Sequence, residues 1–352
     1  MKKEEFEKWL IELSSQQVEE VYLSPGTYPF IKKAGKTMPL QEEEKVESNY
    51  TEDIIDLILL TKERDTFEKE GHFEVAYSIE KVGRYRIRFG KQRSSITVML
   101  HVKSLNIPKP EELRIPEQVC ELFNDKTGLF LICGDKKSGK AQTAASLLQF
   151  EINKKPLIIA TVENSIDYLI SHGKGIINQM EVGMDISDMS TGLKEGINNY
   201  SDLIYLNELS GQEMIKNVME EIEKGVSIVA CVDAISVEGA LHKLIYSFNQ
   251  DKQFYVRFLL SKYLKGIICE KYVSTIEDEL IPVFEVLIVN QAVQKMLAEN
   301  KLSQLNALFE SYEKHGIMSM DQAVLQLLKE GIITKDEAYQ QLKDKQKLLV
   351  KG

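Results

Sequence analysis

The sequence predicts an α/β protein built from two domains, and three observations support this prediction. The chain has 352 residues, roughly twice the length of a typical domain. Four short apolar segments, at 128–134, 156–163, 202–208 and 226–233, have helical patterns between the first two and between the last two, as parallel strands buried on both faces do. Residues 72–103 instead hold three β-rich segments with short breaks at Lys81–Gly83 and Gly90–Ser95, which indicates a small antiparallel sheet.

The first hundred residues mix short helices with strands. An amphipathic helix is predicted at the N-terminus from the spacing of the apolar residues Phe6, Leu10, Ile11, Leu13 and Val18. A strand is predicted at 21–26, ending in a Pro-Gly turn, and residues 29–40 are predicted to form a hairpin around Ala34-Gly35. Thr51 is predicted to open a helix over 51–69, because its side chain can accept a hydrogen bond from the first turn.

A linker is predicted at 106–116, because three prolines between Ile107 and Pro116 restrict the backbone and remove donors. After about residue 290 the pattern becomes wholly helical. Gly331 is predicted to end one of these helices, and Thr334 is predicted to cap the next one.

Composition excludes several classes of protein. With 44 basic and 54 acidic residues the net charge is −10, which disfavours a nucleic-acid motor because such proteins need a cationic surface to displace counterions from phosphate. The four cysteines form no CxxC pair, so buried thiols are expected rather than a disulfide framework or a zinc site. The N-terminus lacks the continuous apolar core of a signal peptide, and we expect no membrane-spanning segment, so the chain is expected to be cytoplasmic.

The segment Gly134-Asp135-Lys136-Lys137-Ser138-Gly139-Lys140 fits the phosphate-loop pattern GxxxxGK. It directly follows an apolar strand and directly precedes a helical pattern, which is the context that this motif requires. Glycines allow backbone N–H groups to surround phosphate oxygens, the helix N-terminus adds partial positive charge, and the lysine reaches the terminal phosphates. The segment therefore predicts a nucleotide site formed by Gly134, Ser138, Gly139, Lys140, Ala141 and Gln142.

The motif lacks its last element. The residue after the lysine should be Ser or Thr, whose hydroxyl ligates Mg²⁺, but it is Ala141. Thr143 is a poor substitute, because each further residue turns the side chain about 100° around the helix. No protein ligand for a metal is therefore predicted here, and we expect nucleotide binding to be preserved better than catalysis.

Many further segments in the same order resemble the PilT-like ATPases of twitching motility, within the superfamily of secretion and type IV pilus motor ATPases. The resemblance covers nearly the whole chain. It is carried by VYLSPGTYPFIKKAGKTMPL and GRYRIRFGKQRSSITVMLHV before the phosphate loop, and after it by TVENSIDY (161–168), NQMEVGMD (178–185), DLIYLNELSG (202–211), VACVDAIS (229–236), FEVLI (284–288) and GIMSMDQAVLQLLKEGIITKDEAY (316–339).

This resemblance implies a domain division and an assembly. A PAS-like domain would occupy 1–105, a RecA-like ATPase domain 117–289 and a helical region 290–352. The family also implies ATP as the ligand, and a hexameric ring of identical or paralogous subunits. The ring would lie at the inner-membrane base of the pilus and contact its platform protein.

The resemblance also assigns roles to single residues. Lys140 matches the Walker A lysine, Glu208 the catalytic Walker B glutamate and Glu163 the first acid of the Asp box. Basic positions of the N-terminal sheet, some of which act as arginine fingers in such rings, are matched by Arg84, Arg86 and Arg93. An alternative for these arginines is a solvated strand edge protected by charge.

Seven positions depart from the family pattern. Ala141 replaces the Walker A hydroxyl, Asn164 the second Asp-box carboxylate and Asp233 the His-box histidine. Asn207 and Ser210 replace the glycine before and the arginine after the Walker B glutamate, and Met180 and Asn198 replace two further arginines. Because phosphoryl transfer depends on a metal, cationic groups and a carboxylate that orients water, these changes predict weak or lost ATP hydrolysis.

Three functions follow from these observations. The favoured one is a pilus-motor subunit that binds nucleotide, hydrolyses it weakly or not at all, and modulates an intact paralogue. The second is an active but divergent retraction motor, supported by the retained Lys140, Glu208 and Glu163. The third is a non-catalytic adaptor that uses the fold as a docking surface.

Overall fold

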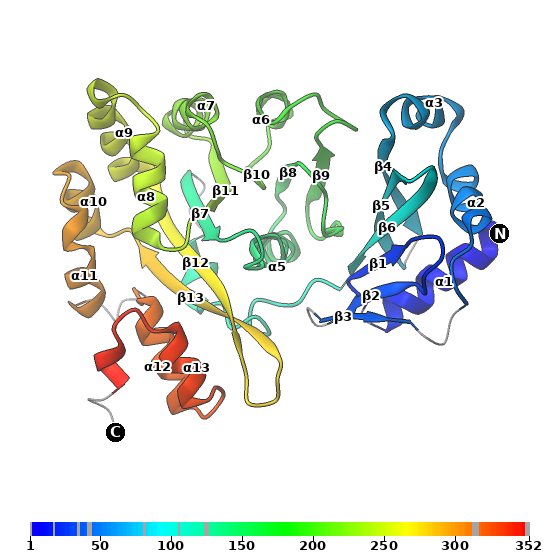
Figure 1. Ribbon diagram of the computed structural model, residues 1–352. Coiled ribbons are helices and arrows are strands. Elements are labelled where there is room, and N and C mark those ends of the chain that lie inside the picture. Colours follow the sequence, from blue (N-terminus) through cyan, green and yellow to red (C-terminus); the bar gives the residue numbers. More distant parts are fainter. Residues whose placement is uncertain are drawn as a thin grey trace. The chain divides into compact units, whose positions relative to one another are not determined.

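The computed structural model describes residues 2–16, 18–33, 36–40, 44–79, 82–104, 106–122, 127–311 and 317–348. The chain separates into two compact units (Figure 1). The first comprises Met1–Asn106 together with Asp167–Leu169, and the second comprises Ile107–Ile166 and Ile170–Gly352. The predicted hairpin turn at Ala34-Gly35 lies outside the described residues.

The first unit contains a six-stranded antiparallel sheet with the order β3-β2-β1-β6-β5-β4. The strands are β1 (Glu20–Leu23), β2 (Phe30–Lys33), β3 (Lys36–Pro39), β4 (His72–Ile79), β5 (Gly83–Gln92) and β6 (Ser95–Ser104). Its helices are α1 (Lys3–Ser15), α2 (Ser48–Ile58) and α3 (Thr61–Glu70). The small antiparallel sheet predicted from the sequence is confirmed.

Strand β5 alternates strictly between the core and the opposite face of the sheet. Tyr85, Ile87 and Phe89 are fully buried, whereas the intervening Arg84 and Arg86 are only partly buried. A period of two residues has this effect in any strand with one buried face.

Three predictions for this unit need correction. The single helix over 51–69 is instead two helices, with an extended break at Leu59-Leu60. Thr51 does not cap a helix, because α2 begins earlier, at Ser48, and the buried Thr51 hydroxyl donates to the carbonyl of that residue. The predicted break at Gly90–Ser95 is shorter than expected, since β5 and β6 pair up to Gln92 and Ser95.

The second unit is built on a seven-stranded sheet with the order β13-β12-β7-β11-β10-β8-β9. Its strands are β7 (Gly128–Gly134), β8 (Ile158–Glu163), β9 (Ile176–Glu181), β10 (Leu203–Leu206), β11 (Ser227–Asp233), β12 (Leu264–Ser274) and β13 (Leu280–Ile288). All neighbours pair in parallel except β12 and β13, which are antiparallel. The four predicted parallel strands are confirmed as β7, β8, β10 and β11.

Helices cover this sheet, and further helices follow its last strand at the C-terminal end of the chain (Figure 1). They are α4 (Glu117–Glu121), α5 (Lys140–Lys154), α6 (Met189–Asn198), α7 (Gln212–Glu223), α8 (Val237–Tyr246), α9 (Gln250–Tyr263), α10 (Gln291–Ala298), α11 (Leu305–Ser311), α12 (Met320–Lys329) and α13 (Lys335–Gln341), with short 3-10 turns at Leu302–Gln304 and Lys345–Leu348. One core cluster joins Leu129, Leu131 and Cys133 of β7 to buried side chains of α7, α8 and α9.

The predicted C-terminal signals are confirmed. Gly331 follows α12 with a positive φ of 71°, a conformation that glycine adopts without steric cost. The Thr334 side chain accepts a hydrogen bond from the Glu337 N–H at the start of α13.

All four cysteines are buried thiols, as expected. Among the described residues no helix has the length and apolarity needed to cross a membrane.

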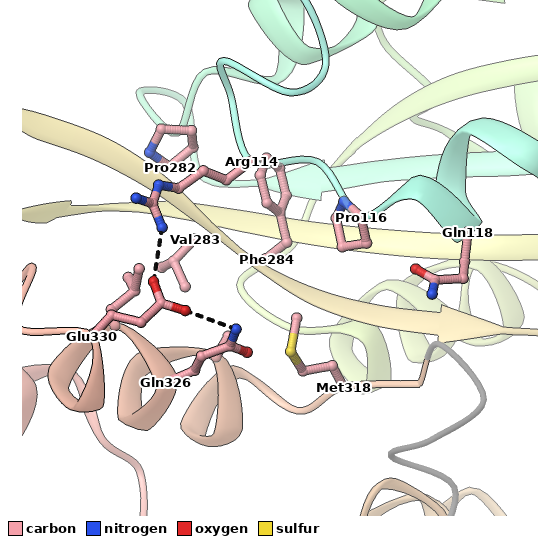
Figure 2. A pocket seen from close by; sticks show the side chains of 11 residues that line it. Arg114, Pro116, Gln118, Pro282, Val283, Phe284, Met318, Gln326 and Glu330 are labelled. Atoms are coloured by element: carbon pink, nitrogen blue, oxygen red, sulfur yellow. Dashed lines mark hydrogen bonds and ion pairs between the residues drawn. The ribbon is translucent and has the colours of Figure 1, made fainter.

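The predicted proline-rich linker packs onto the second unit. Leu113 and Ile115 are buried, and the Arg114 guanidinium forms an ion pair of 3.1 Å with Glu330 at the end of α12. Figure 2 shows this pair at the edge of a cavity of about 410 Å³ between the linker, β13 and α12. The segment after Ile107 is therefore held by packing as well as by its prolines.

Two neighbouring strands, β12 and β13, each carry a buried glutamate. Glu270 is 2% exposed, and its carboxylate accepts a hydrogen bond from the Thr143 hydroxyl of α5. The neighbouring Glu285 of β13 accepts one from the Val237 N–H at the start of α8, with a distance of 2.8 Å. Burial raises the pKa of Glu270 to about 8, although the Thr143 hydrogen bond and the charge of Lys140 lower it.

The buried carboxyl of Glu270 predicts a pH-dependent stability. Because its pKa rises from 4.5 in the unfolded chain to about 8 in the folded chain, unfolding between these values releases a proton. Stability is therefore highest below pH 4.5 as far as this group is concerned, and falls by up to about 1.4 kcal/mol per pH unit as pH rises toward 8.

Glu270→Gln should remove this contribution, so urea unfolding at pH 6, 7 and 8 should show a shallower loss of stability than in the wild type. Glu285 remains in both proteins, so the difference isolates Glu270. Glu299→Gln, at an exposed position after α10, is the control for a change of one charge. Parallel slopes for the wild type and Glu270→Gln would contradict the assignment.

Candidate functional site

The phosphate loop connects the end of β7 to the start of α5, as the sequence predicts. At Gly134, a Cβ atom would lie 2.0 Å from the Ser138 Oγ. At Gly139, where φ is +99°, a Cβ atom would lie 2.5 Å from the hydroxyl of Tyr272 on β12. Both positions therefore require glycine, and the tight loop they permit leads into the N-terminus of α5, where free N–H groups favour an anion.

Lys140 is held by three acceptors. Its ammonium donates to the carbonyl oxygen of Gly134 at 3.1 Å and to that of Asp135, and it forms an ion pair of 3.1 Å with the Asp233 carboxylate. Asp233 is the last residue of β11 and the register partner of Gly134. The residue predicted to replace the His-box histidine therefore lies directly against the predicted Walker A lysine.

The first turn of α5 offers no hydroxyl to a metal ion bound at the loop. Position 141 is alanine, and the Gln142 side-chain oxygen accepts a hydrogen bond of 3.1 Å from the Tyr272 hydroxyl. Thr143 is 2% exposed, and its hydroxyl donates to Glu270. The loop thus fits a phosphate group, but these side chains do not supply the hydroxyl ligand that Mg²⁺ has in a complete motif.

Glu208 lies at a second cluster, in the loop after β10. One of its carboxylate oxygens accepts a hydrogen bond of 2.7 Å from the Asn164 side chain, and the other accepts one of 2.7 Å from the Ser210 hydroxyl. The side-chain oxygen of Asn207 accepts a hydrogen bond of 3.0 Å from the Asn164 N–H. Three of the positions predicted to depart from the family pattern are therefore grouped around Glu208.

Glu163 points into the protein at the end of β8. It is 5% exposed, and one carboxylate oxygen accepts hydrogen bonds from the Thr161 hydroxyl at 2.6 Å and the Gln179 side chain at 3.1 Å. Gln179 belongs to β9, so this carboxylate joins β8 to the edge strand β9. Its predicted role in catalysis stays a prediction.

The remaining departures lie in different environments. Met180 is 6% exposed and belongs to the hydrophobic core of the second unit, where a methionine side chain is better suited than a charged arginine. Asn198 is exposed at the last residue of α6.

The three candidate arginines belong to the first unit. Arg86 pairs with Glu74 on the adjacent strand β4, and Arg84 lies on the same face of β5. Arg93 is exposed in the two-residue turn between β5 and β6, where it and Ser94 have positive φ angles of 48° and 63°. The alternative of a strand edge protected by charge is wrong for β5, because this strand pairs with β4 on one side and β6 on the other. Contact of these arginines with a phosphate stays a prediction.

Two residues that the sequence analysis missed complete the surroundings of the loop. The Glu270 carboxylate accepts a hydrogen bond from Thr143 in the first turn of α5. The Tyr272 hydroxyl lies beside Gly139 and donates to the side chain of Gln142. The signal was present, because a carboxylate in the apolar segment GIICEKYV (266–273) is unusual for a buried strand. Its meaning depends on the pairing of β12 with β7, which the sequence does not show.

Comparison with known proteins supports the predicted family. No family model matches the chain. It is 27% identical over 335 residues to the type IV pilus ATPase PilU of Pseudomonas aeruginosa, which covers 95% of this chain and 87% of PilU. It is 24% identical to the type IV pilus retraction ATPase PilT of the same organism, over 94% of this chain and 96% of PilT.

A solved structure agrees with these relatives. The crystal structure of the pilus retraction motor PilT with bound ADP matches with a TM-score of 0.90 and 27% identity, and the match covers 99% of each chain. In both sequence and fold, this chain is thus similar to PilT-like pilus ATPases.

Proposed function

We propose that this chain is a nucleotide-binding subunit of a type IV pilus motor, acting in pilus retraction and twitching motility, whose own ATP hydrolysis is weak or lost. The observation that carries the proposal is at the start of α5. The loop keeps its glycines and Lys140, whereas Ala141 lacks a hydroxyl and the Thr143 hydroxyl is used by Glu270.

Nucleotide binding is supported by the geometry of the loop and by the solved relative, which holds ADP. The groups that would bind the phosphates are backbone N–H groups of the loop Gly134–Gly139, the N-terminus of α5 and the Lys140 ammonium. ATP is the ligand we propose, bound without a hydroxyl ligand from the loop to its metal ion.

Weak hydrolysis follows from what the remaining side chains can do. In a phosphoryl transfer to water, a carboxylate must orient the attacking water molecule. Each oxygen of Glu208 already accepts one hydrogen bond, from Asn164 or Ser210, which leaves fewer of its lone pairs to orient a water molecule. Loss of one such function typically costs 10²- to 10⁴-fold in rate, and losses at neighbouring groups do not add.

The assembly and location are part of the same proposal. We propose a hexameric ring, of this chain alone or mixed with a paralogue, at the cytoplasmic face of the inner membrane beside the pilus platform protein. Arg84, Arg86 and Arg93 are the candidates for contacts to a neighbour's nucleotide, and Glu163 and Glu208 for the acidic groups at the nucleotide. The domain division at 1–105, 106–116, 117–289 and 290–352 also stays a proposal.

A binding measurement tests the missing metal ligand. Calorimetric titration with ADP should give dissociation constants that differ less than threefold between Mg²⁺ and EDTA, because the loop has no hydroxyl for the ion. Ala141→Thr should introduce a preference of at least tenfold for the Mg²⁺ condition, and Lys140→Ala should weaken binding in both conditions by at least tenfold. A strong dependence on Mg²⁺ in the wild type would contradict the proposed site.

A turnover measurement tests the weak hydrolysis. With Mg²⁺-ATP, the purified chain should release phosphate at least about 100-fold more slowly than a motif-complete relative assayed in parallel. Rapid turnover that is abolished by both Lys140→Ala and Glu208→Gln would show an active, divergent motor instead. Those two variants are the matched controls, since they separate turnover by this site from a contaminating ATPase.

A third outcome would favour the adaptor. The relevant result is a folded chain that binds neither ADP nor ATP at millimolar concentration while its thermal unfolding transition stays cooperative. The proposal would then fail at its first step, and the fold would have to act as a docking surface alone.

A further inference from the structure

Asp233 is placed next to the loop by the sheet itself. Its backbone is the register partner of Gly134 in the parallel pair β7–β11, and the following Ala234 N–H donates to the Gly134 carbonyl at 3.2 Å. The Asp233 carbonyl accepts a hydrogen bond of 3.1 Å from the Lys243 ammonium of α8. Because its main chain is anchored to both β7 and α8, Asp233 can leave Lys140 only by rotating its side chain.

Each of the three N–H donors of the Lys140 ammonium has an acceptor nearby. An ammonium group carries three N–H bonds, and the three acceptors around Lys140 are the carbonyls of Gly134 and Asp135 and the carboxylate of Asp233. The Lys140 side chain is 12% exposed, whereas that of Asp233 is 44% exposed. The Asp233 carboxylate is therefore the more exposed member of the pair, and a ligand that replaces it at the lysine has to displace this charge.

The two terminal phosphates of a nucleotide meet this charge to different extents. In a phosphate loop the backbone N–H groups hold the α- and β-phosphates, and the lysine reaches the β- and γ-phosphates. A γ-phosphate adds negative charge at the end of the ligand that depends on the lysine, and so comes closest to the Asp233 carboxylate. Like charges at such short range repel strongly where water is partly excluded.

The other charged groups near the loop do not cancel this effect. Asp135 adds a further carboxylate, whose oxygen accepts the Lys137 N–H at 2.8 Å, and Glu270 lies buried beneath the helix start. Lys136 and Lys137 are exposed on the loop and attract any phosphate, whether it is terminal or not. Lys243 donates to the Asp233 carbonyl.

We propose that Asp233 makes this site select a nucleoside diphosphate over a triphosphate. The inference rests on the proposed function, because it requires the loop to bind nucleotide, and it names the charge state of the ligand that the site prefers. Such a subunit holds the product form of the nucleotide and competes poorly for ATP in a mixed ring.

The test compares two ligands on three proteins. ADP and the non-hydrolysable imido analogue of ATP are titrated by calorimetry, in EDTA, into the full-length wild type, Asp233→Asn and Glu330→Gln. The wild type should bind ADP at least tenfold more tightly than the analogue. Asp233→Asn keeps the shape of the side chain, and should tighten binding of the analogue at least tenfold and that of ADP less than threefold.

Glu330→Gln is the matched control. It removes one negative charge from an ion pair with the same N···O distance of 3.1 Å and a similar side-chain exposure, 39% against 44%. It belongs to the end of α12 and should leave both affinities unchanged. Thermal unfolding of each variant, expected within a few degrees of the wild type, verifies that the folded chain is being titrated.

The outcomes separate the inference from the proposed function. Equal affinity of the wild type for both ligands, or an equal gain for both in Asp233→Asn, overturns the selection of diphosphate and leaves nucleotide binding intact. If neither ligand binds to the wild type or to Asp233→Asn, both the inference and the proposed function fail.

Discussion

The pairing of β7 with its two parallel neighbours determines the site. In a parallel sheet the carboxyl ends of the strands meet at one edge, and ligands of α/β proteins bind there. Because β11 and β12 flank β7, Asp233 comes next to Gly134 from one side, while Glu270 and Tyr272 lie under the loop from the other. The ion pair of Lys140 with Asp233 and the hydrogen bond of Thr143 with Glu270 both depend on this register.

Two acidic side chains, Asp233 and Glu270, interact electrostatically with the loop lysine Lys140. A single ammonium group stands between an exposed carboxylate at Asp233 and a buried carboxyl at Glu270, whose pKa is raised to about 8 by burial. Because of this raised pKa, Glu270 carries less negative charge near neutral pH than the exposed carboxylates of Asp233 and Asp135. This arrangement explains how the loop keeps its shape, and why the charge of the ligand should matter to its affinity.

The departures around Glu208 act together, because they are in contact. Asn164 and Ser210 donate to opposite oxygens of the same carboxylate, and Asn207 holds the backbone of Asn164. The resemblance predicts that relatives carry an acid, an arginine and a glycine at these positions, and an acid at 164 would be placed against Glu208. An amide at 164 donates a hydrogen bond to Glu208 where a carboxylate would repel it, so the uncharged side chains around Glu208 are physically consistent as a unit.

Strand and helix positions followed from local patterns, since apolar periodicity, Gly331 and Thr334 each act within a few residues. So did the phosphate loop, because glycines at Gly134 and Gly139 and a lysine at Lys140 encode its conformation and charge locally. The sequence could not show that Thr51 lies within a helix, because tertiary burial of that helix outweighs its capping preference. It also could not show that Asp233 forms an ion pair with Lys140 or that the Thr143 hydroxyl donates a hydrogen bond to Glu270. These contacts join residues about 90 and 130 positions apart, and only the lateral order of the strands, a property of the folded sheet, brings them together.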